Sequence, residues 1–112
     1  MKICFNGCSF TVGEGFPLGE RINYIYTNLL AKKFRVEQQN IAIGGSSNHT
    51  IFMRSVLQNK FLEVDQTKWV NLFESFQKNT IDVGPEGHHP GIKSHQWMAN
   101  QIANYIIENK II

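Results

Sequence analysis

Lys2-Ile3-Cys4-Phe5-Asn6-Gly7 is the stretch from which the predicted fold is built. A short apolar run closed by a glycine is typical of a buried strand in an α/β sheet. The residues that follow, from Gly7 to Gly19, are rich in glycine and predict a loop. This loop is long for a simple connection, and long loops in compact domains are commonly functional.

A helix and a second strand are predicted next. Over Arg21–Phe34, apolar residues recur at three- and four-residue steps and predict one buried face, formed by Ile22, Ile25, Tyr26, Leu29 and Leu30. Arg35–Ile43 then predicts a second strand, with Val36–Ile43 as its core. It ends in a second glycine turn, Gly44-Gly45, which leads directly into another helix.

That second helix starts at a capping residue, Ser47 or Asn48, and is predicted to run to about Lys60. Its predicted inward residues are Ile51, Phe52, Val56 and Leu57. Strand, glycine loop and helix, repeated twice, indicate a parallel sheet, whose sites lie at the carboxyl ends of its strands. The two glycine loops are therefore expected at the same edge of the sheet.

The pattern weakens beyond this point and recovers near the carboxyl end. Lys68–Leu72 favours a third strand and Glu74–Asn79 a short helical turn, although apolar runs this short are ambiguous. The last helix is predicted over Ile92–Ile107, with one face formed by Ile92, His95, Met98, Ala99, Ile102 and Ile106.

Composition restricts the function classes. With 112 residues, 42% hydrophobic and 18% charged, the chain predicts a single domain over residues 1–112. A net charge of +2 without a basic stripe argues against a nucleic-acid partner. No apolar run approaches the roughly 20 residues that span a bilayer, and the N-terminal apolar run is too short for a signal peptide. The default expectation is a cytoplasmic protein with no membrane partner.

Cys4 and Cys8 are the two cysteines, and without an export signal they are expected to be reduced thiols. A dithiol redox pair or a zinc site remains an alternative that no further cysteine supports. The simpler interpretation packs Cys4 in a strand and leaves Cys8 at the edge of a site.

Ser9 is the candidate nucleophile, because it follows a strand and a glycine that permits a tight turn. A serine hydroxyl needs an adjacent base to be reactive. The alternative is a loop serine that bonds to local backbone.

The candidate base lies in Gly84-Pro85-Glu86-Gly87-His88-His89-Pro90. A neutral His89 imidazole can take a proton near neutral pH and return it to a leaving group. Glu86, three residues earlier, can hold the other ring nitrogen. Alternatively, Glu86 caps the next segment and both histidines are solvated. A metal site is less favoured, because adjacent histidines in an extended segment point to opposite sides.

Two further histidines and the second glycine turn complete the candidate residues. His95 is expected to be a partly buried core residue in the last helix, and His49 to be exposed. Gly44 and Gly45 let a backbone amide approach a ligand oxygen, which suits an oxyanion donor and equally suits a plain turn. Their spacing lacks the glycine pattern of phosphate loops.

Three blocks together resemble the SGNH (GDSL-type) hydrolase family. Gly7-Cys8-Ser9 is similar to its first block, Gly-Asp-Ser, with Cys8 in place of the acid. Asn40–Ser47 is similar to the second block, with its glycine at Gly45, and Glu86–Pro90 resembles the last block, Asp-x-x-His-Pro. The resemblance covers roughly the first 55 and the last 30 residues.

The resemblance implies a flavodoxin-like three-layer α/β/α sandwich and a metal-free, cofactor-free hydrolase of acyl or carbohydrate esters. Ser9 would be the nucleophile, His89 the base and Glu86 its orienting carboxylate. The Ser9 and Gly45 backbone amides would form two parts of the oxyanion hole.

Two departures from the family pattern change the expectation. The family's Gly-x-Asn-Asp block, which supplies a side-chain amide to the oxyanion hole, is missing between Gly45 and Glu86. Asn48 replaces it only if its loop folds inward. The chain is also short, so central strands are expected to be absent and the last strand region to pair with the first. A reduced sheet leaves an edge through which two copies can pair.

These departures keep two other functions open. One is a degenerate binding or structural protein that retains the fold without catalysis. The other is a metal site at His88, His89 and His95.

Overall fold

Two short strands that lie far apart in sequence pair in parallel. In the computed structural model, which describes residues 2–62 and 81–111, β1 (Lys2–Phe5) pairs with β2 (Glu37–Asn40). Lys2 lies opposite Glu37 and Phe5 opposite Asn40. β2 is shorter than predicted, but the chain still runs beside the first loop, because the Ile41 N–H donates to Phe5 O and the Ile43 N–H to Gly7 O. Both glycine loops therefore leave the same edge of the sheet, as predicted.

The predicted first helix is two helices. α2 (Leu18–Tyr24) and α3 (Tyr26–Phe34) are separated by Ile25, whose backbone is extended at φ −72° and ψ 140°. This break rotates α2 relative to α3, so Ile22 is 70% exposed and does not share the buried face of Tyr26 and Leu30. The prediction of one continuous face was wrong because periodicity alone does not reveal a one-residue interruption.

The predicted glycine-rich loop contains a short helix, α1 (Ser9–Val12). Cys8 O accepts the backbone N–H groups of Thr11 and Val12, both at 3.1 Å, and Gly13 ends the helix in the left-handed region at φ 88°. Ser9 is therefore the first residue of a helical turn, not a residue of an open loop.

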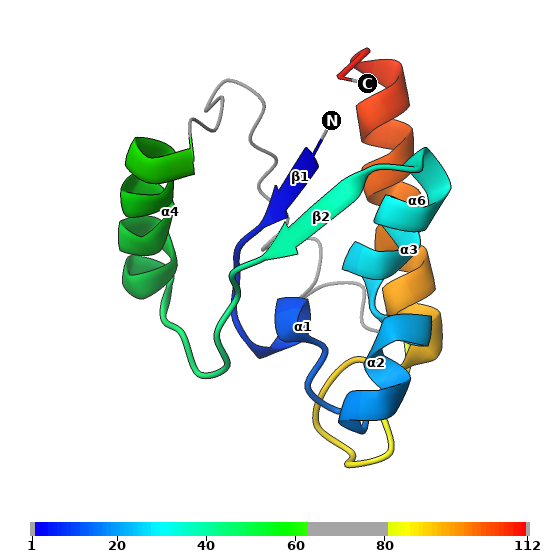
Figure 1. The fold of residues 1–112 in the computed structure, drawn as a ribbon. Helices are drawn as coiled ribbons and strands as arrows, with labels where there is room; N and C mark the ends of the chain where they lie inside the picture. The colour runs from blue at the N-terminus through cyan, green and yellow to red at the C-terminus, as the bar shows by residue number, and fades with distance from the viewer. Residues whose placement is uncertain (1, 63–80, 112) are drawn as a thin grey trace.

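The core lies between the sheet and two helices. α3 and α6 (Ile92–Glu108) pack side by side on one face of the sheet (Figure 1). The buried cluster comprises Phe5, Tyr26, Leu30, Met98, Ala99, Ile102, Ala103 and Ile106. The predicted face of the last helix is thus confirmed except at Ile92, which is exposed.

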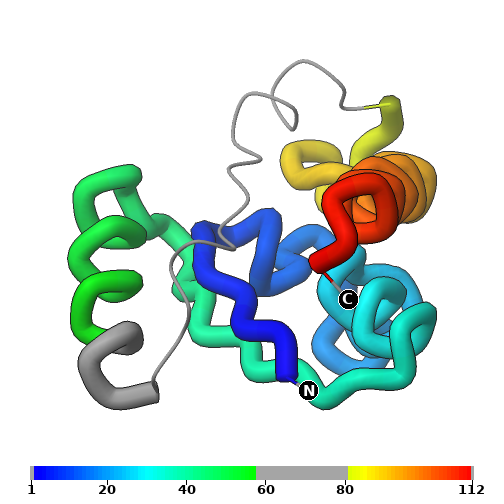
Figure 2. Tube along the Cα trace, turned by 90° about the horizontal axis from the view of Figure 1, so that it is seen from above, coloured from blue at the N-terminus to red at the C-terminus, as the bar shows by residue number. Residues whose placement is uncertain are grey.

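α4 (Asn48–Leu62) stands on the other side of the sheet (Figures 1 and 2). Ser47 caps it, because the Thr50 N–H donates to Ser47 Oγ at 3.2 Å. Of the predicted inward residues, Ile51 is half-buried, but Phe52, Val56 and Leu57 are 63%, 43% and 54% exposed, so the prediction was wrong for these three. Within the described residues, the N-terminal half of α4 is held by hydrogen bonds of Ile51 O and Arg54 to the two glycine loops and not by an apolar face.

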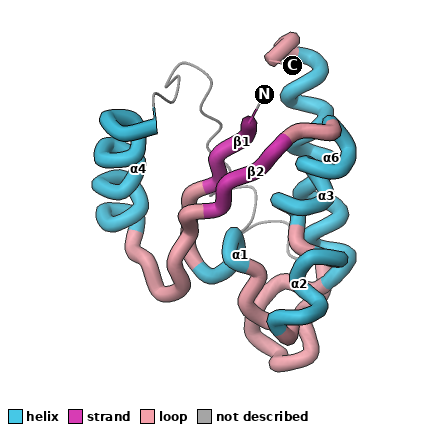
Figure 3. Tube along the Cα trace, viewed as in Figure 1, coloured by secondary structure: helices cyan, strands magenta, loops and turns pink. Residues whose placement is uncertain are grey.

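The described residues thus form an α/β domain with a two-stranded parallel sheet and five helices (Figure 3). The predicted third strand, Lys68–Leu72, and the turn at Glu74–Asn79 lie outside the described residues. Within the described ranges, Val83 forms an isolated antiparallel bridge with Pro90 and does not pair with β1. None of the helices described is both long and apolar enough to cross a bilayer.

His95 connects α6 to the start of α3. The side chain is fully buried, and its Nδ1 accepts the Tyr26 backbone N–H at 3.1 Å. Its ring stacks on Tyr26 and contacts Phe16, with ring centroids 5.9 and 5.4 Å apart. Burial lowers the pKa of His95 from 6.5 to about 4, although the Asp82 charge opposes the shift. His95 is thus buried more deeply than predicted.

This histidine makes stability depend on pH. Because the pKa of His95 is lower in the folded chain than in the unfolded chain, its stabilising effect is complete above pH 6.5 and is lost as the pH falls toward 4. We expect the free energy of unfolding, measured by urea denaturation, to fall by about 1 to 3 kcal/mol across this window.

In the variant His95→Asn, the amide oxygen can still accept the Tyr26 N–H but does not titrate. We expect this variant to be less stable at pH 7 because it fills less space, and to show a flatter pH dependence between 6.5 and 5. An unchanged slope in the variant would contradict the assignment.

Candidate active site

The end of β1 positions the turn that carries Ser9. A Cβ at Gly7 would overlap the Thr11 side chain, so the close approach of α1 to the strand requires glycine. Thr11 is buried, its hydroxyl contacts the Tyr26 hydroxyl at 2.9 Å, and its carbonyl accepts the Asn40 side-chain N–H at 2.8 Å. These contacts fix α1, and with it Ser9, relative to both strands and α3.

Arg54 of α4 joins the two glycine loops. Its guanidinium donates to Asn6 Oδ1 at 2.8 Å and Gly7 O at 3.1 Å in the first loop, and to Ser46 Oγ at 2.6 Å in the second. Gly45 has a positive φ of 73° and open space where a Cβ would stand. Within the described residues, no hydrogen bond takes the backbone N–H of Gly45 or that of Ser9.

The predicted base lies in a tight turn that Glu86 organises. The Gly84 N–H donates to His89 O at 2.7 Å, and the Gly87 N–H donates to Gly84 O at 3.0 Å. Glu86 Oε1 accepts the backbone N–H groups of His88 and His89. Glu86 therefore caps its own turn. The alternative interpretation, in which Glu86 caps the next segment and both histidines are solvated, agrees with the structure only in the exposure of His88, because His89 is half-buried.

The same carboxylate also faces the His89 ring. Glu86 Oε1 lies 3.1 Å from Nδ1, although this nitrogen makes no aligned hydrogen bond within the described part of the chain. The backbone N–H of His89, with further contributions from His88 and the His89 ring, outweighs desolvation and lowers the pKa of Glu86. Glu86 therefore stays ionised beside the imidazole well into the acidic range.

The two ends of the chain meet at this turn. The His89 ring lies edge-on to the Phe10 ring, with centroids 5.8 Å apart. Gly15 has φ +103°, and a Cβ there would stand 2.8 Å from His89 Cβ and 3.3 Å from Glu86 Oε1. A Cβ at Gly84 would likewise stand 2.9 Å from Gly15 O. The loop that carries Ser9 and the turn that carries His89 therefore pack directly against each other.

The Ser9 hydroxyl and the His89 ring are not hydrogen-bonded among the residues that the structure describes. Ser9 is half-buried and precedes Phe10, which contacts the ring. His89 Nε2 lies 3.8 Å from Glu14 Oε2, so a carboxylate stands beside the nitrogen that would serve a nucleophile.

Glu14 was not predicted as a site residue. It follows α1, and a Cβ at Gly44 would overlap its carboxylate. The Glu14 side chain thus lies between the second glycine turn and His89. Its sequence neighbours Gly13 and Gly15, both with positive φ, are the signal of a tight turn that could have drawn attention to it.

Asp82 and Ser94 fix the His89 turn to α6. Asp82 accepts the backbone N–H of Lys93 at 3.0 Å, the backbone N–H of Ser94 at 2.8 Å and the Ser94 hydroxyl at 2.7 Å. Desolvation acts to raise the pKa of Asp82, but these hydrogen bonds and the Lys93 charge outweigh it and lower the pKa. Because Asp82 caps a helix that starts ten residues later, local spacing rules did not find it.

The remaining predicted residues lie apart from this cluster. Asn48, His49 and His88 are exposed, and His95 is in the core between Phe16 and Tyr26. The described residues contain no group of three or more His, Cys, Asp or Glu side chains able to hold a metal. Cys4 and Cys8 are free and half-buried, and burial raises the pKa of the Cys4 thiol.

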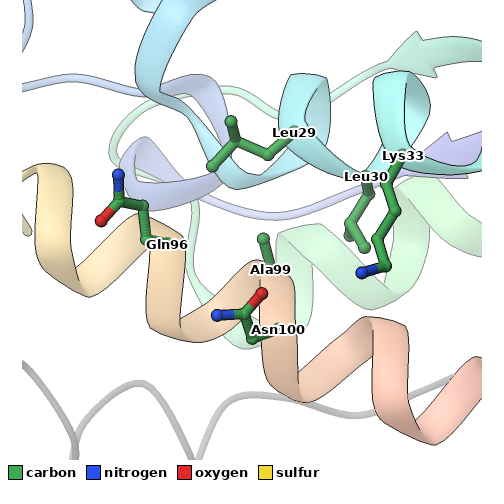
Figure 4. A pocket seen from close by; sticks show the side chains of 6 residues that line it. All are labelled: Leu29, Leu30, Lys33, Gln96, Ala99 and Asn100. Atoms are coloured by element: carbon green, nitrogen blue, oxygen red, sulfur yellow. The ribbon is translucent and has the colours of Figure 1, made fainter.

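A hollow of about 320 Å³ lies between α3 and α6 (Figure 4). Its lining residues are Leu29, Leu30, Lys33, Gln96, Ala99 and Asn100. None of them belongs to the glycine loops or the His89 turn, so the hollow is separate from the candidate site.

Comparisons with known proteins do not extend this description. No protein-family model, curated protein or solved structure matches the chain.

The contact between Gly15 and His89 predicts an asymmetric pair of alanine substitutions. Gly15→Ala introduces a Cβ at positive φ against His89, and we expect it to lower the free energy of unfolding by about 2 kcal/mol. Gly19→Ala, in α2 with open space around it, is expected to be neutral or stabilising by up to about 1 kcal/mol. Chemical denaturation of both variants checks this pair, and equal effects would contradict the described contact.

Proposed function

We propose that the protein is a serine-dependent hydrolase of carboxylic esters, with a reduced form of the flavodoxin-like α/β/α sandwich of the SGNH (GDSL-type) family. The observation that carries the proposal is the packing of the Glu86–His89 turn against the loop that bears Ser9. Helices on both sides of a parallel sheet are in keeping with such a fold (Figure 1).

In the proposed reaction, Ser9 Oγ attacks the ester carbonyl while His89 Nε2 takes the hydroxyl proton. The imidazolium then returns that proton to the departing alkoxide, which leaves an acyl-Ser9 intermediate. Water, activated by the same nitrogen, releases the acid and restores Ser9. In this reaction Glu86, whose Oε1 lies 3.1 Å from Nδ1, would accept the Nδ1–H and so hold the ring in one orientation.

The oxyanion would be held by the backbone N–H groups of Ser9 and Gly45, which donate no hydrogen bond within the described residues. Asn48 is exposed at the start of α4, and the asparagine block of the family is missing. Losing one oxyanion donor costs ~3 kcal/mol of transition-state stabilisation, which is roughly a hundredfold in rate. We therefore expect the enzyme to have a low turnover rate.

The second candidate function is a non-catalytic binding or structural protein with the same fold. Two observations favour it: among the residues that the structure describes, no hydrogen bond joins Ser9 to His89, and the sheet has only two strands. In that case Glu86 serves as the cap of its turn and His89 as a packing partner of Phe10.

Hydrolysis of p-nitrophenyl acetate distinguishes these candidates. We expect slow turnover by the purified chain, a loss of at least about a hundredfold in Ser9→Ala and His89→Gln, and little change in His88→Gln. His88 is the matched control because it is the exposed histidine next to His89. Turnover that survives Ser9→Ala would reject Ser9 as the nucleophile.

A further inference from the structure

Glu14 brings a negative charge to the centre of the candidate site. Its carboxylate lies 3.8 Å from His89 Nε2 and against the backbone of Gly44, so it stands between the proposed base and the second glycine turn. The side chain is 40% exposed, which leaves it accessible to a ligand in solution. The proposed reaction assigns no role to an acid at this position.

The charge of Glu14 is not neutralised by a fixed cation in the described part of the chain. The basic side chains on neighbouring elements, Arg21 and Arg54, donate to the carbonyls of Phe16 and Gly7 and form no ion pair with Glu14 there. Its described ionic contact is with His89, which faces Glu86 on its other side. The site therefore presents two carboxylates around a single imidazole.

A substrate that reaches His89 Nε2 must come close to Glu14. A general base works within about 3 Å of the atom it deprotonates, and Glu14 Oε2 lies 3.8 Å from His89 Nε2. The nucleophilic oxygen, next to the ester that it attacks, therefore lies within about 7 Å of the Glu14 carboxylate. This separation is shorter than the Debye length of about 8 Å at physiological salt, so the interaction is not screened out. Charge on either side of the ester bond is thus felt by Glu14.

We infer that Glu14 is a specificity-determining residue that selects esters carrying a positive charge near the scissile bond and rejects anionic ones. This inference rests on the proposed function, because the ester is the substrate of that reaction. The preference for a cation beside His89 can nevertheless be measured without the reaction. For a partly exposed carboxylate, the expected preference over an uncharged isostere is about fivefold.

The test compares acetylthiocholine with its uncharged isostere, 3,3-dimethylbutyl thioacetate. We expect kcat/KM to favour the cationic ester about fivefold in the natural chain and to be equal for both esters in Glu14→Gln. Raising the salt concentration is expected to weaken the preference. Glu20→Gln is the matched control, because it removes an exposed acid on α2 and should leave the preference unchanged.

A binding measurement separates this inference from the proposed reaction. In Ser9→Ala protein, NMR titration with choline and with 3,3-dimethylbutan-1-ol is expected to show the same preference, and the double variant with Glu14→Gln is expected to lose it.

Ser9-dependent turnover with no effect of Glu14→Gln would overturn the inference and leave the proposed function standing. Absent turnover with the Glu14-dependent binding preference intact would reject hydrolysis and support the inference. Equal binding of both alcohols would overturn it.

Discussion

The structure depends on the close packing of two backbone turns that are distant in sequence. Gly84 lies on the carbonyl of Gly15, and Gly15 in turn lies on His89, where any side chain at either glycine would collide. Because glycine has no Cβ and occupies both contact positions, the turn near the carboxyl end can approach the edge of the sheet formed near the amino end. Glu86 adds rigidity, because one carboxylate oxygen accepts two backbone N–H groups and also faces the ring.

This contact is supported from behind by α6. Asp82 and Ser94 tie the beginning of the turn to the first residues of the helix, and His95 ties the helix to the start of α3 through the Tyr26 N–H. Tyr26 also contacts Thr11 in α1, the helical turn that carries Ser9. A continuous set of hydrogen bonds thus links the position of His89 to that of Ser9 through the core.

Local patterns in the sequence predicted part of this arrangement. The strand before Gly7, a cap at Ser47 or Asn48 and the buried face of the last helix follow from short-range rules. The structure confirms the strand, places the cap at Ser47 and confirms the helix face except at Ile92. The break at Ile25 was not predictable from local sequence. The Tyr26 N–H that follows the break donates to His95, which lies 69 residues later in the chain. The exposed face of α4 was mispredicted because an apolar pattern does not specify whether a partner surface lies beside it.

For the candidate site, the sequence spacing predicted that Glu86 holds the second ring nitrogen of His89. In the structure Glu86 Oε1 lies 3.1 Å from Nδ1 without an aligned hydrogen bond among the described residues. The strand order correctly predicted that both glycine loops leave the same edge of the sheet. Sequence did not reveal Glu14, Arg54 or Asp82, because each acts on a segment remote from its own helix or turn. Such long-range polar contacts have no periodic signature, so they emerge only when the chain is folded.

The central claim is that a reactive Ser9 lies within reach of His89, and labelling with a fluorophosphonate probe tests it most directly. The account predicts one covalent adduct, located at Ser9 by peptide mass spectrometry, and much slower labelling in His89→Gln than in His88→Gln. An unlabelled protein, or an adduct on a different serine, would contradict the account.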